Sequence, residues 1–275
     1  MVSHDTNTGT THLLADLTDG VLTLTMNRPD ARNAMTLEML DAMTDQLARA
    51  ETANDVHCIV LTGSGKGFCS GGDVKAMADP DSPDHPANAT DAYIHRQRLI
   101  QRATAGKLFH MPKPTLAVIN GAAAGAGLAL ALACDLRIMA NDAILMTAFS
   151  RVGVSGDFGG TYFMTQLVGA ARARELYFLS DRVSADRAVD LGLANWTCPL
   201  GELPAQALAV ARRLAEGPGI AYRYMKENLN RAMAGEADDC LDLEATHHVH
   251  CMFTADHREA TAAFVEKREP IFTGG

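Results

Sequence analysis

Apolar positions in the first 200 residues gather in short runs bounded by turn residues, whereas beyond that point they recur at helical spacing. The runs at 21–26, 57–62 and 115–119 have the length and the borders of β-strands, and each leads through a turn into a helix-like segment. Repeated units of strand, turn and helix can stack into a coil whose turns bury a shared core. The pattern therefore predicts an α/β fold.

Some local signals are specific enough to place single elements. Asp19-Gly20 separates two apolar runs and predicts a tight β-hairpin. Thr36 and Ser184 each precede a helical pattern, so we expect both to cap a helix N-terminus. A helix carrying several basic residues is expected over 93–110.

The C-terminal part of the chain has almost only helical spacing. Beyond Pro204 we expect four helices, at 205–216, 221–233, 236–253 and 256–268. Asp256 followed by Glu259 resembles a capping box at the start of the last one. Because these helices have too little apolar face to form a domain alone, we expect them to pack on the core and on other subunits. The predicted division is a core over 1–200 and a helical region over 201–275.

The longest uncharged stretch, 115–134, has two interpretations. Its length allows a transmembrane helix. Asn120-Gly121 and two further glycines interrupt it, which favours a strand, a turn of small residues and a helix. Backbone N–H groups at the start of a helix can bind an anion or a carbonyl oxygen, and small residues let a substrate lie against them. We therefore expect a binding site within this stretch.

Composition and charge narrow the classes of function. The chain has 275 residues and 47% apolar content, enough for one large domain or two small ones with a good core. The formal net charge of −9 argues against a nucleic-acid partner and against binding to an anionic membrane. No signal peptide is visible, and six cysteines without CxxC pairs look like reduced thiols, so we expect a cytoplasmic protein.

Four motifs in a fixed order carry a family resemblance: MNRPDARNAM at 26–35, GKGFCSGGDVKAM at 65–77, KPTLAVINGAAAGAGLALALACDLRIM at 113–139 and AFVEKREPIF at 263–272. With them, the chain resembles the enoyl-CoA hydratase/isomerase (crotonase) superfamily over residues 12–273. The resemblance implies a crotonase-like ββα superhelix with a C-terminal helical trimerisation region, assembled as a homotrimer or a dimer of trimers. It also implies an acyl-CoA thioester substrate, with coenzyme A as part of the substrate and no further cofactor.

The resemblance also implies an oxyanion hole made of two backbone N–H groups, which fall on Gly72 and Ala126. Physical chemistry agrees, because two converging donors in a dry pocket stabilise the charge on a thioester enolate, each by about 3 kcal/mol.

Coenzyme A would contact further residues of the same motifs, which are Arg28, Arg32, Ala34 and Lys75. Phe264 and Lys267 would reach the nucleotide from the neighbouring subunit. Asp30 stands where many relatives have a lysine, which weakens the expected phosphate pocket.

The chain departs from the hydratases at two decisive positions. Hydratases place and activate a water molecule with two glutamates, which would fall at Ala129 and Phe149. Asp157 instead matches a loop position where several isomerases and a dehalogenase branch carry a catalytic aspartate. A carboxylate among apolar groups becomes more basic, because its charged form is disfavoured. The alternative is that Asp157 is a loop or N-cap residue.

The prediction is therefore an acyl-CoA isomerase of the Asp-based branch, which shifts a double bond or isomerises a ring through a thioester enolate with Asp157 as base. Three alternatives stay open: an enoyl-CoA hydratase, a dehalogenase or hydrolase with Asp157 as nucleophile, and a non-catalytic acyl-CoA binding protein. Phe149, Phe158 and Met164 indicate an apolar or aromatic acyl group.

A histidine-rich segment is the one candidate for a metal site, and its members are His247, His248, His250, Cys251 and His257. The segment matches an ordinary helix of the family, so no metal is predicted.

Overall fold

The computed structural model describes residues 6–73, 78 and 89–275. Two sheets form the framework, one with strand order β1-β2-β3-β5-β7-β10 and one with order β4-β6-β8-β9. Lys75, predicted to contact coenzyme A, lies outside the described residues.

The larger sheet begins with a hairpin. Strands β1 (Leu13–Thr18) and β2 (Val21–Met26) pair antiparallel. Their turn at Asp19 and Gly20 has φ of 50° and 76°, as a two-residue hairpin turn requires. The predicted hairpin is confirmed. The strands that follow in this sheet run parallel, and they are β3 (Cys58–Gly63), β5 (Thr115–Ile119), β7 (Leu136–Ala140) and β10 (Trp196–Cys198).

The smaller sheet shows that the predicted repeat is a coil. After each of β3, β5 and β7, the chain turns into a short strand of the second sheet. In the same order, these short strands are β4 (Gly67–Cys69), β6 (Ala122–Ala124) and β8 (Ile144–Met146). These pair parallel, and β9 (Val183–Ser184) closes the sheet antiparallel to β8. Each turn of the coil thus contributes one strand to each sheet, which confirms the α/β superhelix.

Helices cover the sheets. The long ones of the core are α1 (Leu37–Thr52), α3 (Thr90–Gln101), α5 (Ala126–Ala133), α6 (Gly160–Leu179) and α8 (Leu203–Ala215). Short ones are η1 (Pro29–Ala31), α4 (Lys107–His110), η4 (Phe149–Val152) and α7 (Ala185–Asp190). Thr36 and Ser184 cap α1 and α7 through their side chains, as predicted. The helix expected over 93–110 contains a π-helical turn, η3 (Arg102–Gly106).

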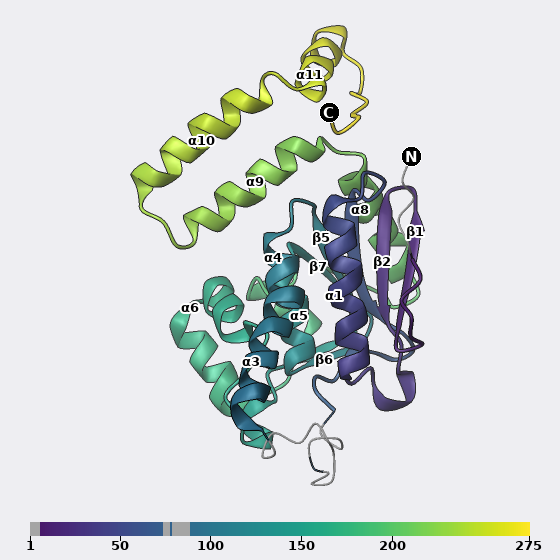
Figure 1. Cartoon of the computed structure of the whole chain (residues 1–275), viewed down its shortest axis with the longest axis vertical. Coiled ribbons are helices and arrows are strands. Elements are labelled where there is room, and N and C mark those ends of the chain that lie inside the picture. Colours follow the sequence, from purple (N-terminus) through teal and green to yellow (C-terminus); the bar gives the residue numbers. More distant parts are fainter. Residues whose placement is uncertain (1–5, 74–77, 79–88) are drawn as a thin grey trace.

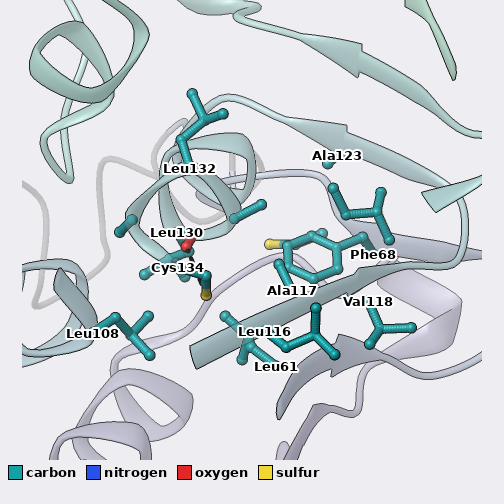
Figure 2. Close-up of a cluster of buried hydrophobic side chains, with 14 of the residues drawn as sticks. Leu61, Phe68, Leu108, Leu116, Ala117, Val118, Ala123, Leu130, Leu132 and Cys134 are labelled. Carbon is teal, nitrogen blue, oxygen red and sulfur yellow. Dashed lines mark hydrogen bonds between the residues drawn. The ribbon is translucent and has the colours of Figure 1, made fainter. Parts of the chain in front are cut away.

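Helix α5 lies in the middle of the core and is buried along its whole length. Figure 2 shows Leu130 and Leu132 of this helix in one apolar cluster with Phe68 and Leu116 from the strands. The uncharged stretch 115–134 is therefore a strand, a turn and a buried helix, and its transmembrane interpretation is wrong. Among the described residues, no helix is long and apolar enough to cross a membrane.

The last three helices form an arm. Helices α9 (Gly219–Ala232) and α10 (Ala237–Cys251) run antiparallel, and α11 (Ala255–Glu266) lies beyond them, away from the sheets (Figure 1). An ion pair anchors α9 to the core, because Nζ of the buried Lys226 lies 2.8 Å from Oδ2 of the more exposed Asp135. Helix α8 packs on the larger sheet. The division at residue 200 stays a prediction.

Apolar side chains remain exposed on this arm, among them Leu229, Leu241, Val249 and Phe253. The expectation that the arm packs on other subunits agrees with this surface and stays a prediction.

The predicted capping box at the start of α11 is wrong. Thr254 is the N-cap, and its side chain accepts from the N–H of His257. Asp256 is instead buried and accepts hydrogen bonds from the backbone of Thr273 and Gly274. Because a side chain two residues earlier already caps the helix, Asp256 is free to bind the C-terminal tail.

Candidate active site

Two glycine-containing turns bring Gly72 and Ala126 together. Gly71 has φ of +93°, and a β-carbon there would lie 3.0 Å from the carbonyl oxygen of Ala124 and 3.3 Å from the nitrogen of Ala126. Only a glycine permits this approach of two backbone segments. The segment is held by a bridge to Met35, whose N–H donates to the Gly71 carbonyl oxygen at 2.8 Å.

Ala126 is the first residue of α5, directly after the N-cap Gly125 with φ of 54°. The first N–H groups of a helix have no partner within it. Within residues 6–73 and 89–275, neither Gly72 nor Ala126 donates its N–H to another backbone group. The two predicted oxyanion donors therefore lie close together, and in the described part of the chain neither N–H is used by another backbone group.

Asn33 fixes the same region and was not predicted. It is fully buried at a left-handed φ of 56°, and its side-chain nitrogen donates to the carbonyl oxygens of Ser64 and Gly67 at 2.9 and 2.8 Å. The motif that contains it was the only available signal, because the partners lie more than 30 residues away in the sequence.

Of the predicted coenzyme A contacts, Arg28 and Ala34 support the site from within the chain. The Arg28 guanidinium donates to the Ala34 carbonyl oxygen at 2.7 Å and to Asp73 Oδ2 at 3.0 Å. It thereby ties the first motif to the residue after Gly72. Arg32 is exposed next to this pair, with φ of 52°. Contact of these residues with coenzyme A stays a prediction.

Phe264 lies on α11, and Lys267 is the residue directly after that helix. Figure 1 shows α11 well apart from α5. The Phe264 side chain is 85% exposed. Within one chain the structure does not bring these two residues to the site, so they would reach it only from a neighbouring copy.

Asp157 lies in a loop of unusual backbone conformation before α6. Gly156, Phe158 and Gly159 all have positive φ, at 115°, 48° and 73°. The N-cap of α6 is Gly159, so the interpretation of Asp157 as a side-chain N-cap is wrong. The N–H of Phe158 donates to Oε1 of Gln101 at 2.8 Å, and this contact holds the loop against α3.

The Asp157 carboxyl group is in an apolar environment. Burial raises its pKa from 3.8 to about 6. Its Oδ1 atom is buried and has no hydrogen-bond partner among the described residues. The negative charge of Asp157 adds to burial in raising the pKa of the Cys69 thiol, to about 12. Since the Cys69 sulfur accepts from the N–H of Gly71 at 3.4 Å, Asp157 and the two N–H groups share one neighbourhood.

The two positions of the hydratase glutamates face this neighbourhood and are apolar. A β-carbon at Gly160 would lie 3.1 Å from Cβ of Ala129 and 2.6 Å from the hydroxyl of Tyr177. The Phe149 ring stacks on Tyr177, with centroids 5.7 Å apart. Burial and the Asp157 charge raise the pKa of Tyr177, so the phenol stays neutral. Tyr177 was missed, because an aromatic residue on a helix has no sequence signal for this position.

The histidine-rich segment has another structural role. Among the described residues, no group of three or more His, Cys, Asp or Glu side chains could hold a metal ion. His247 instead stacks on Tyr224 and places Nδ1 2.6 Å from Oδ1 of Asn228, which joins α10 to α9.

The family described as Enoyl-CoA hydratase/isomerase matches residues 16–275. The chain is 35% identical to the 1,2-epoxyphenylacetyl-CoA isomerase of Escherichia coli (strain K12), covering 95% of this chain and 98% of that protein. It is 30% identical to the short-chain-enoyl-CoA hydratase of Clostridium acetobutylicum, covering 90% and 92%. A solved enoyl-CoA hydratase from Polaromonas sp. JS666 superposes with a TM-score of 0.86 at 32% identity, covering 94% and 99%.

Proposed function

This chain belongs to the enoyl-CoA hydratase/isomerase family and has the crotonase fold, and from this premise we propose that it is an acyl-CoA isomerase with Asp157 as its single general base. One observation carries the proposal. Asp157 has a buried Oδ1 without a hydrogen-bond partner in the described part of the chain and a pKa raised by burial to about 6, whereas the positions of the two hydratase glutamates are Ala129 and Phe149. A base with a pKa near the working pH can both accept and return a proton.

The proposed reaction is a proton transfer in two steps. The thioester oxygen accepts hydrogen bonds from the N–H groups of Gly72 and Ala126, which stabilise the enolate by about 3 kcal/mol each. Asp157 removes a proton from a carbon acidified by the thioester and becomes a neutral acid. It then returns the proton to another carbon, so a double bond has moved and no atom is gained or lost.

Water addition is disfavoured by the same surroundings. It needs groups that hold and activate a water molecule, and a methyl group and a phenyl ring stand at the two positions concerned. The stacked Phe149 and Tyr177 rings present apolar surface there instead. These rings also favour an apolar or aromatic acyl group.

A second candidate follows from the free Oδ1 atom of Asp157. A carboxylate oxygen without a partner among the described residues can attack a substrate carbon as a nucleophile. Halide would leave in a dehalogenase and the coenzyme A thiolate in a hydrolase, and water would then release the product from the covalent enzyme ester or anhydride. A covalent acyl-enzyme detected by intact-protein mass spectrometry would favour this reaction over isomerisation.

Binding of coenzyme A is proposed at Arg28, Arg32, Ala34 and Lys75, completed by Phe264 and Lys267 of a neighbouring copy in a trimer. The 85% exposure of Phe264 and the exposed apolar residues of the arm support this assembly. Arg28 would serve twice, because its guanidinium also holds Ala34 and Asp73.

The test compares wild type, Asp157→Asn and the control Asp142→Asn, which changes an exposed carboxylate. We expect the wild type to isomerise 3-hexenoyl-CoA and Asp157→Asn to lose about 10²- to 10⁴-fold in kcat, with the control unchanged. Hydration of crotonyl-CoA at equal rates in wild type and Asp157→Asn would contradict the proposal. Loss of all activity in Asp157→Asn alone also excludes a protein that only binds acyl-CoA.

A further inference from the structure

The loop that carries Asp157 adopts a backbone conformation that it does not favour by itself. Phe158 is not a glycine, yet its φ is 48°, and glycines with positive φ stand on both sides of the Asp157–Phe158 pair. Residues other than glycine keep a positive φ only where contacts with the surrounding structure hold them there.

Gln101 supplies that contact. Its side-chain oxygen accepts the N–H of Phe158 at 2.8 Å, across 57 residues of sequence. Phe158 is 3% exposed, so without this acceptor its N–H would be buried and unpaired. Asp157 is the residue directly before this N–H, and any movement of the peptide would carry the carboxyl group with it.

The helix that carries Gln101 is irregular at this point. Gln101 ends α3, and the π-helical turn η3 begins with the next residue. Such turns are rare and occur frequently at functional sites. The turn packs on α5, which begins with Ala126, so one stretch of helix contacts both the proposed oxyanion helix and the Asp157 loop.

We propose that Gln101 is a positioning residue for Asp157, and that its amide oxygen holds the loop so that the carboxyl group stays in its apolar site. The inference rests on the proposed role of Asp157 as base. A neutral acceptor suits this position, because a carboxylate there would place a second negative charge beside the base.

Among the described residues, the groups whose pKa the Asp157 charge raises are the Cys69 thiol on β4 and the Tyr177 phenol on α6. Burial raises the pKa of both, so both are neutral at pH 7. A titration between pH 4 and 8 therefore reports Asp157 and not these neighbours.

The experiment uses Gln101→Leu, which removes the acceptor, Gln101→Glu, which keeps an acceptor and adds a charge, and the surface control Gln206→Leu. The infrared band of the protonated Asp157 carboxyl group is followed against pH, with Asp157→Asn as the blank. We expect a midpoint near 6 in wild type and in the control. Gln101→Leu should lower the midpoint toward about 3.9, because water enters the loosened loop. Gln101→Glu should raise the midpoint, because a second negative charge then lies beside Asp157.

Isomerase kinetics provide a second measurement. Gln101→Leu should lower kcat about 10- to 100-fold with KM changed less than about threefold, because the base is misplaced while substrate binding is kept. Midpoints and kcat equal to wild type in both folded variants would overturn the inference. If Gln101→Leu does not fold, an unshifted midpoint in Gln101→Glu would overturn it alone. If the wild type isomerises nothing and the midpoints still shift, the proposed function fails and the positioning role stands.

Discussion

The two sides of the candidate site are built in different ways. The side that would bind the thioester oxygen consists of backbone, in the turns around Gly72 and Ala126 that belong to successive turns of the coil. The side that would move the proton consists of a side chain, Asp157, held in a loop by contacts from distant helices. The first is part of what stabilises the fold, whereas the second keeps a carboxyl group where its charge is disfavoured. On the backbone side, the same contacts would therefore serve both the reaction and the stability of the fold. On the Asp157 side, the position that would suit proton transfer lowers the stability of the fold.

The backbone side should tolerate change least. Gly71→Ala would add a β-carbon 3.0 Å from the Ala124 carbonyl oxygen at a φ of +93°. We expect a loss of about 10²- to 10³-fold in kcat, as for one misplaced oxyanion donor, and a loss of about 1 to 3 kcal/mol in stability. Steady-state kinetics and urea unfolding measure the two effects.

Gly192→Ala is the matched control, because Gly192 also has positive φ but its nearest described neighbour is 3.9 Å away. It should lose stability from the backbone conformation alone and keep kcat. Equal kcat losses in both variants would mean that the close approach at Gly71 has no role in the site.

The proton-moving side should determine the pH dependence. Burial raises the pKa of Asp157 to about 6, and only the ionised form can accept a proton. We expect kcat to fall about 10-fold per pH unit below 6 and to level off above 7. A pH–rate profile between pH 4 and 8 checks this. A flat profile across that range would exclude Asp157 as the base.

The stability cost of the buried Asp157 carboxyl group should appear in the pH dependence of the free energy of unfolding. The folded-state pKa of Asp157 lies above the ordinary value, so the native state binds the proton more tightly and stability falls as pH rises from about 4 to 6. Replacing the carboxyl group removes this loss. We therefore expect Asp157→Asn to gain about 2 kcal/mol over wild type between pH 4 and pH 7. Urea unfolding of both proteins at four pH values measures the difference, and a difference that is constant with pH would contradict the assignment.

The smallest effect is expected at Tyr177. Tyr177→Phe removes a neutral hydroxyl but keeps the ring that stacks on Phe149. We expect kcat within about threefold of wild type and an Asp157 midpoint raised by less than about half a pH unit, because the loop becomes slightly less polar. The pH–rate profile of the variant measures both. A loss of 100-fold would instead give the hydroxyl a direct role in the reaction.

The sequence predicted most of the backbone side around Gly72 and Ala126, and only part of the side that holds Asp157. Strands, the Asp19-Gly20 turn and the caps at Thr36 and Ser184 depend on neighbouring residues, so local patterns were sufficient. Gly72 and Ala126 were predicted as oxyanion donors because the resemblance places both in short contiguous motifs, and the structure brings these two segments together.

Asp157 was predicted as the base from the loop position that it shares with the resembled family, but its supporting residues were not predicted. Gln101 is 57 residues from its partner, and no spacing rule connects the two. The same limit explains the wrong capping box at Asp256, since the tail that this residue binds lies 17 residues further along the chain. Arg28 was predicted only as a contact for coenzyme A. Its hydrogen bond to Asp73 was not predicted, because it depends on how two turns of the coil meet.

The π-helical turn after Gln101 has a consequence for how such a site can change through evolution. One residue more or less in a helix rotates everything on one side of it by about 100° relative to the other side. Leu108, beyond the turn, is fully buried in the core, whereas Gln101, before it, faces the Asp157 loop. Loss of a single codon within 102–106 would therefore turn Gln101 away from Asp157 and leave the core contacts of Leu108 in place. A change of one residue in length, rather than a series of substitutions, can exchange the group that contacts the Asp157 loop.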